Sequence, residues 1–114
     1  MSEYKYSFGH LEWEGKSYRK DVTILGDEVI TPWRREHAHR LQFEDLVEVA
    51  TSRPRILVIG TGKNGVMDVP DKVLEKLAEA GIDGRPMPTG RALEHFVELR
   101  KEGKDAAAAL HLTC

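Results

Sequence analysis

The sequence has a single cysteine, no surplus of basic residues and no long hydrophobic run, and each shortage excludes a class of protein. With Cys114 as its only cysteine, the 114-residue chain cannot form an internal disulfide, so we expect a reducing, cytoplasmic setting. The formal net charge of −2 argues against a nucleic-acid binder, which normally carries a basic surplus. No apolar run approaches the roughly 20 residues that a membrane-spanning helix needs, so we expect no membrane partner.

The sequence has the composition of an ordinary soluble globular protein, with 40% hydrophobic and 32% charged residues. The first ten residues have neither the apolar core of a secretory signal nor the arginine-rich composition of a transit peptide. The length allows one hydrophobic core and leaves no room for a cofactor domain beside a substrate domain. We therefore predict a single domain over residues 1–114.

The first third of the chain predicts β-hairpins. Leu11 and Trp13 alternate with polar residues before a turn at Gly15, and Gly26-Asp27 separates two further apolar runs. Short apolar runs joined by such dipeptides are typical of tight hairpin turns. The segment 33–40 has neither a helical nor a strand period, and we predict an irregular loop there.

From residue 43 onward, patterns typical of helices alternate with patterns typical of strands. Helices are predicted over 43–51, from Pro70 to a cap at Gly81, and from a cap at Thr89 to Gly103; strands are predicted over 56–59, 83–88 and 105–112. Four alanines in the last segment favour a helix by propensity alone, but a helix has just ended at Gly103. This order predicts an α/β fold with a parallel or mixed sheet and an antiparallel N-terminal part.

Gly60 to Gly65 follow an apolar strand and spell G-x-G-x-x-G, the pattern of a dinucleotide-binding turn. A true fingerprint begins its helix inside the motif, so that helical amides face the pyrophosphate. Here the next helix begins only at Pro70, and Lys63 is not followed by the Ser or Thr of a phosphate loop. We interpret Gly60 and Gly62 as residues that let the chain leave the strand sharply. We predict no cofactor, although a smaller anion could use the loop amides with Lys63.

The segment WRREHAHR carries the most promising functional patch in the sequence. It concentrates Arg34, Arg35 and Arg40 around Trp33, with only Glu36 opposing them. Trp and Arg are enriched among residues that dominate protein–protein binding, and Arg also binds acidic ligands. The alternative is that the segment is only a solvated loop.

The histidines and the cysteine raise the possibility of a metal site. These residues are His37, His39, His95, His111 and Cys114. Structural zinc sites usually show closely spaced pairs of ligands, and no second pair of that kind occurs here. On a regular strand, His111 and Cys114 would project from opposite faces. We therefore predict neither a metal site nor a Cys–His pair, and no residue is assigned a catalytic role.

Short motifs spread over nearly the whole chain resemble the Mth-nine-three-eight-like domain family. They are Phe8-Gly9, Thr31 to Trp33 with Arg34, LVIGTG, GID at 81–83, MPT at 87–89 and the closing HLTC. The resemblance implies a three-layer α/β fold with a mixed central sheet and a smaller N-terminal β part. Relatives in that family include a mitochondrial assembly factor for respiratory complex I and a cytoplasmic protein associated with fat-cell differentiation. The resemblance carries over no catalytic residues, and Gly84 stands where relatives would have a β-branched residue.

We therefore expect a non-catalytic protein that binds another protein, in the assembly of a larger complex. The alternative is a binder of a small molecule or anion, or an enzyme, that uses the Gly60–Gly65 loop and the Arg34/Arg35 segment in one pocket. The candidate binding residues are Trp33, Arg34, Arg35, Gly60, Gly62 and Lys63. The oligomeric state and the identity of the partner stay open.

Overall fold

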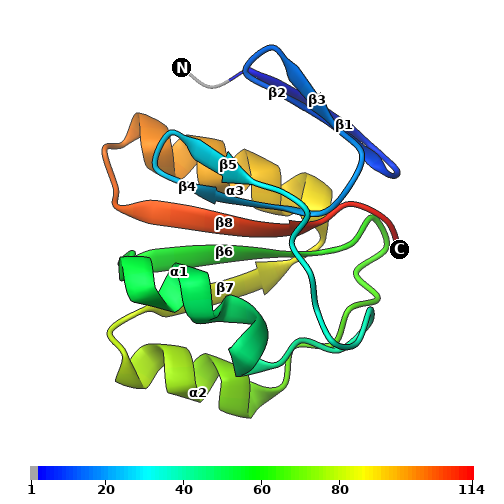
Figure 1. Ribbon diagram of the computed structural model, residues 1–114. Coiled ribbons are helices and arrows are strands. Elements are labelled where there is room, and N and C mark those ends of the chain that lie inside the picture. The colour runs from blue at the N-terminus through cyan, green and yellow to red at the C-terminus, as the bar shows by residue number, and fades with distance from the viewer. Residues whose placement is uncertain (1–2) are drawn as a thin grey trace.

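Two sheets and three α-helices make up the part of the chain that the computed structural model describes, residues 3–114 (Figure 1). The predicted domain also included residues 1 and 2, which lie outside the described residues. The smaller sheet is antiparallel and consists of β1 (Tyr4–Ser7), β2 (His10–Trp13) and β3 (Lys16–Tyr18). The larger sheet has the order β5-β4-β8-β6-β7, with β4 (Val22–Leu25), β5 (Glu28–Ile30), β6 (Ile56–Thr61), β7 (Asp83–Met87) and β8 (Ala106–His111). The helical elements are a 3-10 turn η1 (Phe43–Leu46), α1 (Val47–Ser52), α2 (Asp71–Glu79) and α3 (Thr89–Lys101).

The larger sheet is mixed, as the order of elements predicted. Strand β6 pairs in parallel with both β7 and β8, and β8 pairs antiparallel with β4. The parallel pairs follow from the two crossover helices, since α2 connects β6 to β7 and α3 connects β7 to β8. The prediction of an α/β domain with an N-terminal hairpin part is therefore confirmed.

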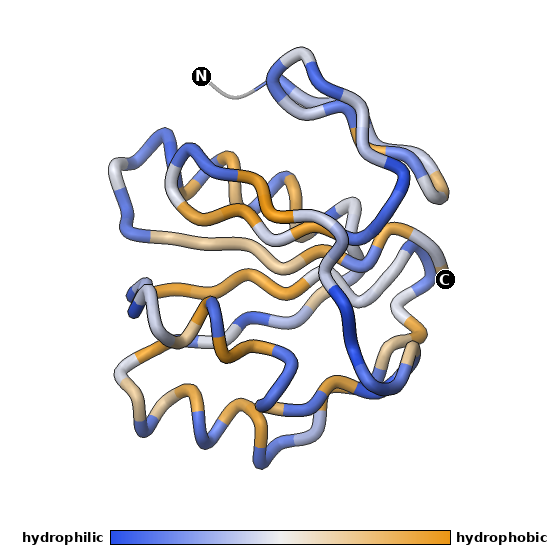
Figure 2. The backbone as a smooth tube through the Cα atoms, in the orientation of Figure 1, coloured by the Kyte–Doolittle hydropathy of each residue, from blue (hydrophilic) through white to orange (hydrophobic). Residues whose placement is uncertain are grey.

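Both faces of the larger sheet are covered, which explains why β6 is apolar at successive positions (Figure 2). Val58 packs on one face with Phe96 of α3 and with Trp13 of the smaller sheet. Leu57 and Ile59 pack on the other face, with residues of α1 and α2. Strand β6 is thus the predicted central strand. Within residues 3–114, the helices are all too short or too polar to cross a bilayer.

The alanine-rich segment is a strand, as predicted, and lies between β4 and β6. Ala108 faces the core that contains α3, whereas Ala107 and Ala109 face the core that contains α1 and α2. Hydrogen-bonding partners on both sides, and cores on both faces, outweigh the helical propensity of alanine.

Two local predictions are wrong. Gly60 does not turn the chain out of the sheet, because it lies within β6 and lacks a positive φ. Its missing side chain instead makes room for α3, since a Cβ there would lie 2.8 Å from Thr89 Oγ1. Thr89 does not cap α3 either, because Pro88 is the N-cap residue and the Thr89 hydroxyl donates to the carbonyl of His111 at 2.6 Å. The turn out of β6 occurs at Gly62, with φ +105°.

Gly84, the departure from the family pattern, has a packing reason. A Cβ at this position would lie 2.9 Å from Leu74 Cδ2 and 3.0 Å from Leu77 Cδ1. The two leucines of α2 therefore fill the space that a side chain on β7 would take, so α2 packs closely on the sheet.

The geometry at Gly62 predicts a large loss of stability on substitution. In Gly62→Ala the new methyl group would lie 2.6 Å from the carbonyl oxygen of Thr113, in addition to the cost of a positive φ. We expect the free energy of unfolding, measured with urea, to fall by about 2–3 kcal/mol. Gly26→Ala is the matched control, because Gly26 also has a positive φ but a Cβ there meets open space. Equal losses in the two variants would contradict the packing described here.

Candidate functional site

A buried ionic cluster lies where the end of β8 meets the start of β4. The antiparallel register places Val22 opposite Leu110, which brings Asp21 beside His111. Arg35 reaches the same point from the connection after β5, and its Nη2 lies 2.8 Å from Asp21 Oδ2. Only 5% of the side chains of Arg35 and His111, and 15% of that of Asp21, is exposed to solvent.

Asp21 is the centre of this cluster because its carboxylate accepts hydrogen bonds from three parts of the chain. Oδ1 accepts from the Leu112 amide at 2.7 Å, and Oδ2 lies 2.8 Å from His111 Nδ1 as well as from Arg35 Nη2. Burial raises the pKa of Asp21, but the hydrogen bonds from His111, the Leu112 amide and Arg35 lower it more. The pKa therefore lies below its ordinary value, and Asp21 is ionised at neutral pH.

The contact with Asp21 decides the tautomer of a neutral His111 ring. His111 Nδ1 lies 2.8 Å from Asp21 Oδ2 and 3.0 Å from Arg35 Nη2. The ionised carboxylate only accepts hydrogen bonds, and Arg35 Nη2 donates to that same oxygen at 2.8 Å, so the arrangement favours a proton on Nδ1 and a lone pair on Nε2. Among the described residues, His111 Nε2 is buried without a hydrogen-bond partner, as are Nε and Nη1 of Arg35. Buried polar atoms without partners are uncommon in folded proteins and often mark functional sites.

Two of the predicted binding residues, Trp33 and Arg35, have largely buried side chains. Trp33 is a core residue with 7% of its surface exposed, and its Nε1 donates to the carbonyl of Asp45 at 2.9 Å. The Arg35 guanidinium lies 4.6 Å from the centre of the Trp33 ring and is paired with Asp21. Of the three predicted residues in this segment, only Arg34 is exposed.

Arg34 and the edge of Trp33 line a groove of about 390 Å³ between the end of β5 and α1. We call it the Trp33 groove; its lining residues are Thr23, Ile30, Pro32, Trp33, Arg34, Glu44, Asp45, Val47, Glu48 and Val49. Val47 is 53% exposed at the first position of α1. The predicted patch is therefore a groove with a tryptophan in its wall, not a projecting anchor.

The glycine loop does not offer free amides to an anion. The Lys63 amide donates to the Thr113 oxygen at 2.8 Å, and the amides of Asn64 and Val66 donate to the Cys114 oxygen at 3.3 and 3.2 Å. The Gly62 amide donates to Thr89 Oγ1 at 2.9 Å. These donors are already paired within the chain, so an anion at this loop would have to bind without them. Arg35 contacts His111 at the end of β8, whereas the loop amides contact Thr113 and Cys114.

The prediction that His111 and Cys114 point to opposite faces is wrong. Strand β8 ends at His111, and the following residues bend toward the glycine loop, where Thr113 and Cys114 accept its amides. One ligand atom each of His39, His111 and Cys114 lies within 4.8 Å of the others. The prediction was wrong because it treated residues 111–114 as one regular strand. Side chains alternate between the two faces only within a strand, and this strand ends at His111.

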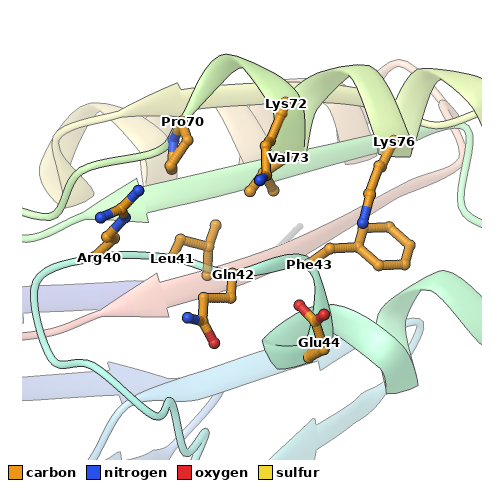
Figure 3. Close-up of a pocket in the computed structure, with 9 residues that line it drawn as sticks. All are labelled: Arg40, Leu41, Gln42, Phe43, Glu44, Pro70, Lys72, Val73 and Lys76. Atoms are coloured by element: carbon orange, nitrogen blue, oxygen red, sulfur yellow. The ribbon is translucent and has the colours of Figure 1, made fainter.

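A second pocket, of about 250 Å³, lies between segment 40–44 and the start of α2 (Figure 3). Its wall includes Arg40, Lys72 and Glu44, and Lys76 Nζ lies 5.6 Å from the centre of the Phe43 ring. None of the six residues predicted as binding residues lines this pocket. It contains no residue of the Asp21 cluster, and it shares Glu44 with the Trp33 groove.

Removing the Asp21 carboxylate is expected to destabilise the protein strongly. Asp21→Asn leaves the buried Arg35 without a counter-charge, and we expect the free energy of unfolding at pH 7 to fall by about 3 kcal/mol. Urea unfolding measures this loss. Asp27→Asn is the control, because Asp27 is fully exposed and its contact with Arg100 is 3.4 Å long, so it should change stability little.

The same carboxylate predicts a pH dependence with a definite sign. Because the native pKa of Asp21 lies below the value of 3.8 for an unperturbed Asp, its contribution is complete above that value and is lost as pH falls through the native pKa. The difference in stability between the wild type and Asp21→Asn should therefore shrink as pH is lowered from 7 to about 2. A difference that is constant across this range would contradict the assignment.

Comparison with known proteins places the fold in a group without an established role. A family model described as protein of unknown function (DUF498/DUF598) matches residues 3–111. The solved structure called MT938 is 27% identical, with full coverage of both chains and a TM-score of 0.84. The conserved hypothetical protein PH1505 of Pyrococcus horikoshii OT3 is 22% identical, with 100% of this chain and 99% of that chain covered and a TM-score of 0.81.

A protein of Bordetella pertussis, whose structure was solved by NMR in solution, is described as an Mth938-like domain. It is 16% identical, with 95% of this chain and 83% of that chain covered and a TM-score of 0.76. These matches confirm the resemblance that the sequence motifs indicated. The chain belongs to the DUF498/DUF598 family of proteins of unknown function, and it has the Mth938-like fold.

Proposed function

We propose that this protein binds an apolar, basic segment of another protein in the Trp33 groove and acts as a non-catalytic factor in assembling a larger complex. The observation that supports this most directly is Val47, which is 53% exposed above the groove. A large apolar side chain left in water at a concave surface is typical of sites that a partner covers. Ile30 and Pro32 extend the apolar wall.

The charges around the groove favour a basic partner. Glu44 and Glu48 are exposed on the side of η1 and α1. The carboxylate of Asp45, in contrast, accepts from the Gln42 amide at 2.9 Å and is already engaged. Arg34 is the one cation among the lining residues, so the exposed carboxylates of Glu44 and Glu48 outnumber it. A segment with Lys or Arg beside an apolar side chain complements this surface.

Arg34 is the residue of the predicted patch that remains exposed to a partner, whereas Trp33 does not project from the surface as a binding side chain. Trp33 supplies a fixed wall, since its indole is held by Asp45, and the partner contributes the inserted side chain. The rival role as an anion binder through the Gly60–Gly65 loop loses support because the loop amides are paired within the chain. The proposed setting is the reducing cytoplasm, where Cys114 stays a thiol.

Site-specific photocrosslinking in native cells tests the proposal. A photoreactive amino acid at position 47 should capture a protein that the same amino acid at position 66 does not, since Val66 is 51% exposed but lies on the loop after β6. Identical captures from the two positions would contradict a specific groove.

The captured protein then allows a quantitative test with purified components. Val47→Asp should weaken its binding at least about tenfold, because a carboxylate opposes both burial and the acidic rim. Val66→Asp should leave binding within about twofold. Reversing the charge at the edge of the groove with Glu44→Lys and Glu48→Lys should also weaken binding of the basic partner, most strongly at low salt. Wild-type affinity in Val47→Asp would overturn the proposal.

A further inference from the structure

We propose that His39, His111 and Cys114 form a zinc-binding site. Their ligand atoms converge within 4.8 Å of one another although they come from three segments of the chain. Two imidazole nitrogens and one thiolate are a donor set that suits Zn²⁺. This inference is independent of the Trp33 groove.

His111 is prepared for a metal by its neighbours. Its Nδ1 lies 2.8 Å from Asp21 Oδ2, and its side chain is 5% exposed. The remaining nitrogen, Nε2, carries the lone pair and has no partner among the described residues. A carboxylate that holds one nitrogen of a histidine while the other binds the metal is the common second-sphere arrangement in zinc proteins. This unpartnered buried nitrogen is the observation that distinguishes the cluster from a chance meeting of polar side chains.

The other two ligands are positioned by backbone hydrogen bonds. The carbonyl of His39 accepts from the Asp68 amide at 2.7 Å. The oxygen of Cys114 accepts from the amides of Asn64 and Val66. The glycine loop and the residues that follow it therefore hold both ligand-bearing segments beside the end of β8.

The three ligand atoms need to move only a short distance to coordinate one zinc ion. Tetrahedral zinc, with bonds of about 2.0–2.1 Å to nitrogen and 2.3 Å to sulfur, places its ligand atoms about 3.3–3.6 Å apart. The three atoms must therefore close by about 1 Å. His39 is exposed and Cys114 is partly exposed, so both side chains can rotate toward the buried His111.

The charges and protons balance on binding. The thiol of Cys114 releases its proton to water as the sulfur–zinc bond forms, while both imidazoles bind through nitrogens that carry no proton. Arg35 does not oppose the cation with a free charge, because it is paired with Asp21 at 2.8 Å. Three protein ligands leave the fourth zinc position open to water from the side of the exposed His39.

The test uses the metal itself with the reduced 114-residue chain. Calorimetry with Zn²⁺ should show one ion per chain, and an excess of Mg²⁺, which prefers oxygen ligands, should not compete. Co²⁺ should bind at the same site and give the strong visible absorption of tetrahedral coordination with a thiolate-to-cobalt band. An absence of saturable zinc binding, or cobalt that lacks the thiolate band, would overturn the proposal.

Variants identify the ligands. His39→Ala and Cys114→Ser change exposed or partly exposed positions, and each should weaken zinc binding by more than the ten- to hundredfold loss that is common for outer-sphere changes. His37→Ala is the matched control, since His37 is an exposed histidine two residues from His39 and is not part of the cluster. It should bind zinc as the wild type does. Wild-type affinity in His39→Ala or Cys114→Ser, or equal losses in His37→Ala, would show that the metal binds elsewhere.

Discussion

The carboxylate of Asp21 is the contact on which the arrangement of the polar region depends. It joins three segments that are far apart in the sequence: the start of β4, the connection that carries Arg35, and the end of β8 with Leu112. A buried arginine is costly without a counter-charge and a buried histidine is costly without a hydrogen-bond partner, and this single carboxylate offsets both costs. Its position also decides which nitrogen of His111 faces away, so a structural contact has a direct chemical consequence.

The contacts between the C-terminal residues and the glycine loop are the second feature that fixes the arrangement of this region. The loop amides that could have faced a ligand donate instead to the oxygens of Thr113 and Cys114, and Gly62 leaves just enough room for that approach. The G-x-G-x-x-G pattern is thus explained by packing of the chain on itself. Since the same contacts bring Cys114 toward His111 and His39, the loop organises the candidate site without lining it.

Much of the fold could be predicted because it depends on local patterns. The apolar run at 56–59, the helix end at Gly81 and the strand at 105–112 each follow from periodicity, capping and the number of residues available. The candidate site could not be predicted in the same way. Asp21 and His111 are 90 residues apart, and their contact follows from the pairing register of β4 with β8. Trp33 and Arg35 look like surface residues in a polar segment until the fold places them beneath it.

The protonation state of the His111 ring tests the central claim most directly. Long-range nitrogen–proton NMR correlations on the ¹⁵N-labelled protein at neutral pH distinguish the two neutral tautomers and the charged form of each histidine. The account predicts that the neutral His111 ring of the metal-free protein carries its proton on Nδ1, toward Asp21, and that its Nε2 is unprotonated. A neutral His111 ring with its proton on Nε2 would contradict it.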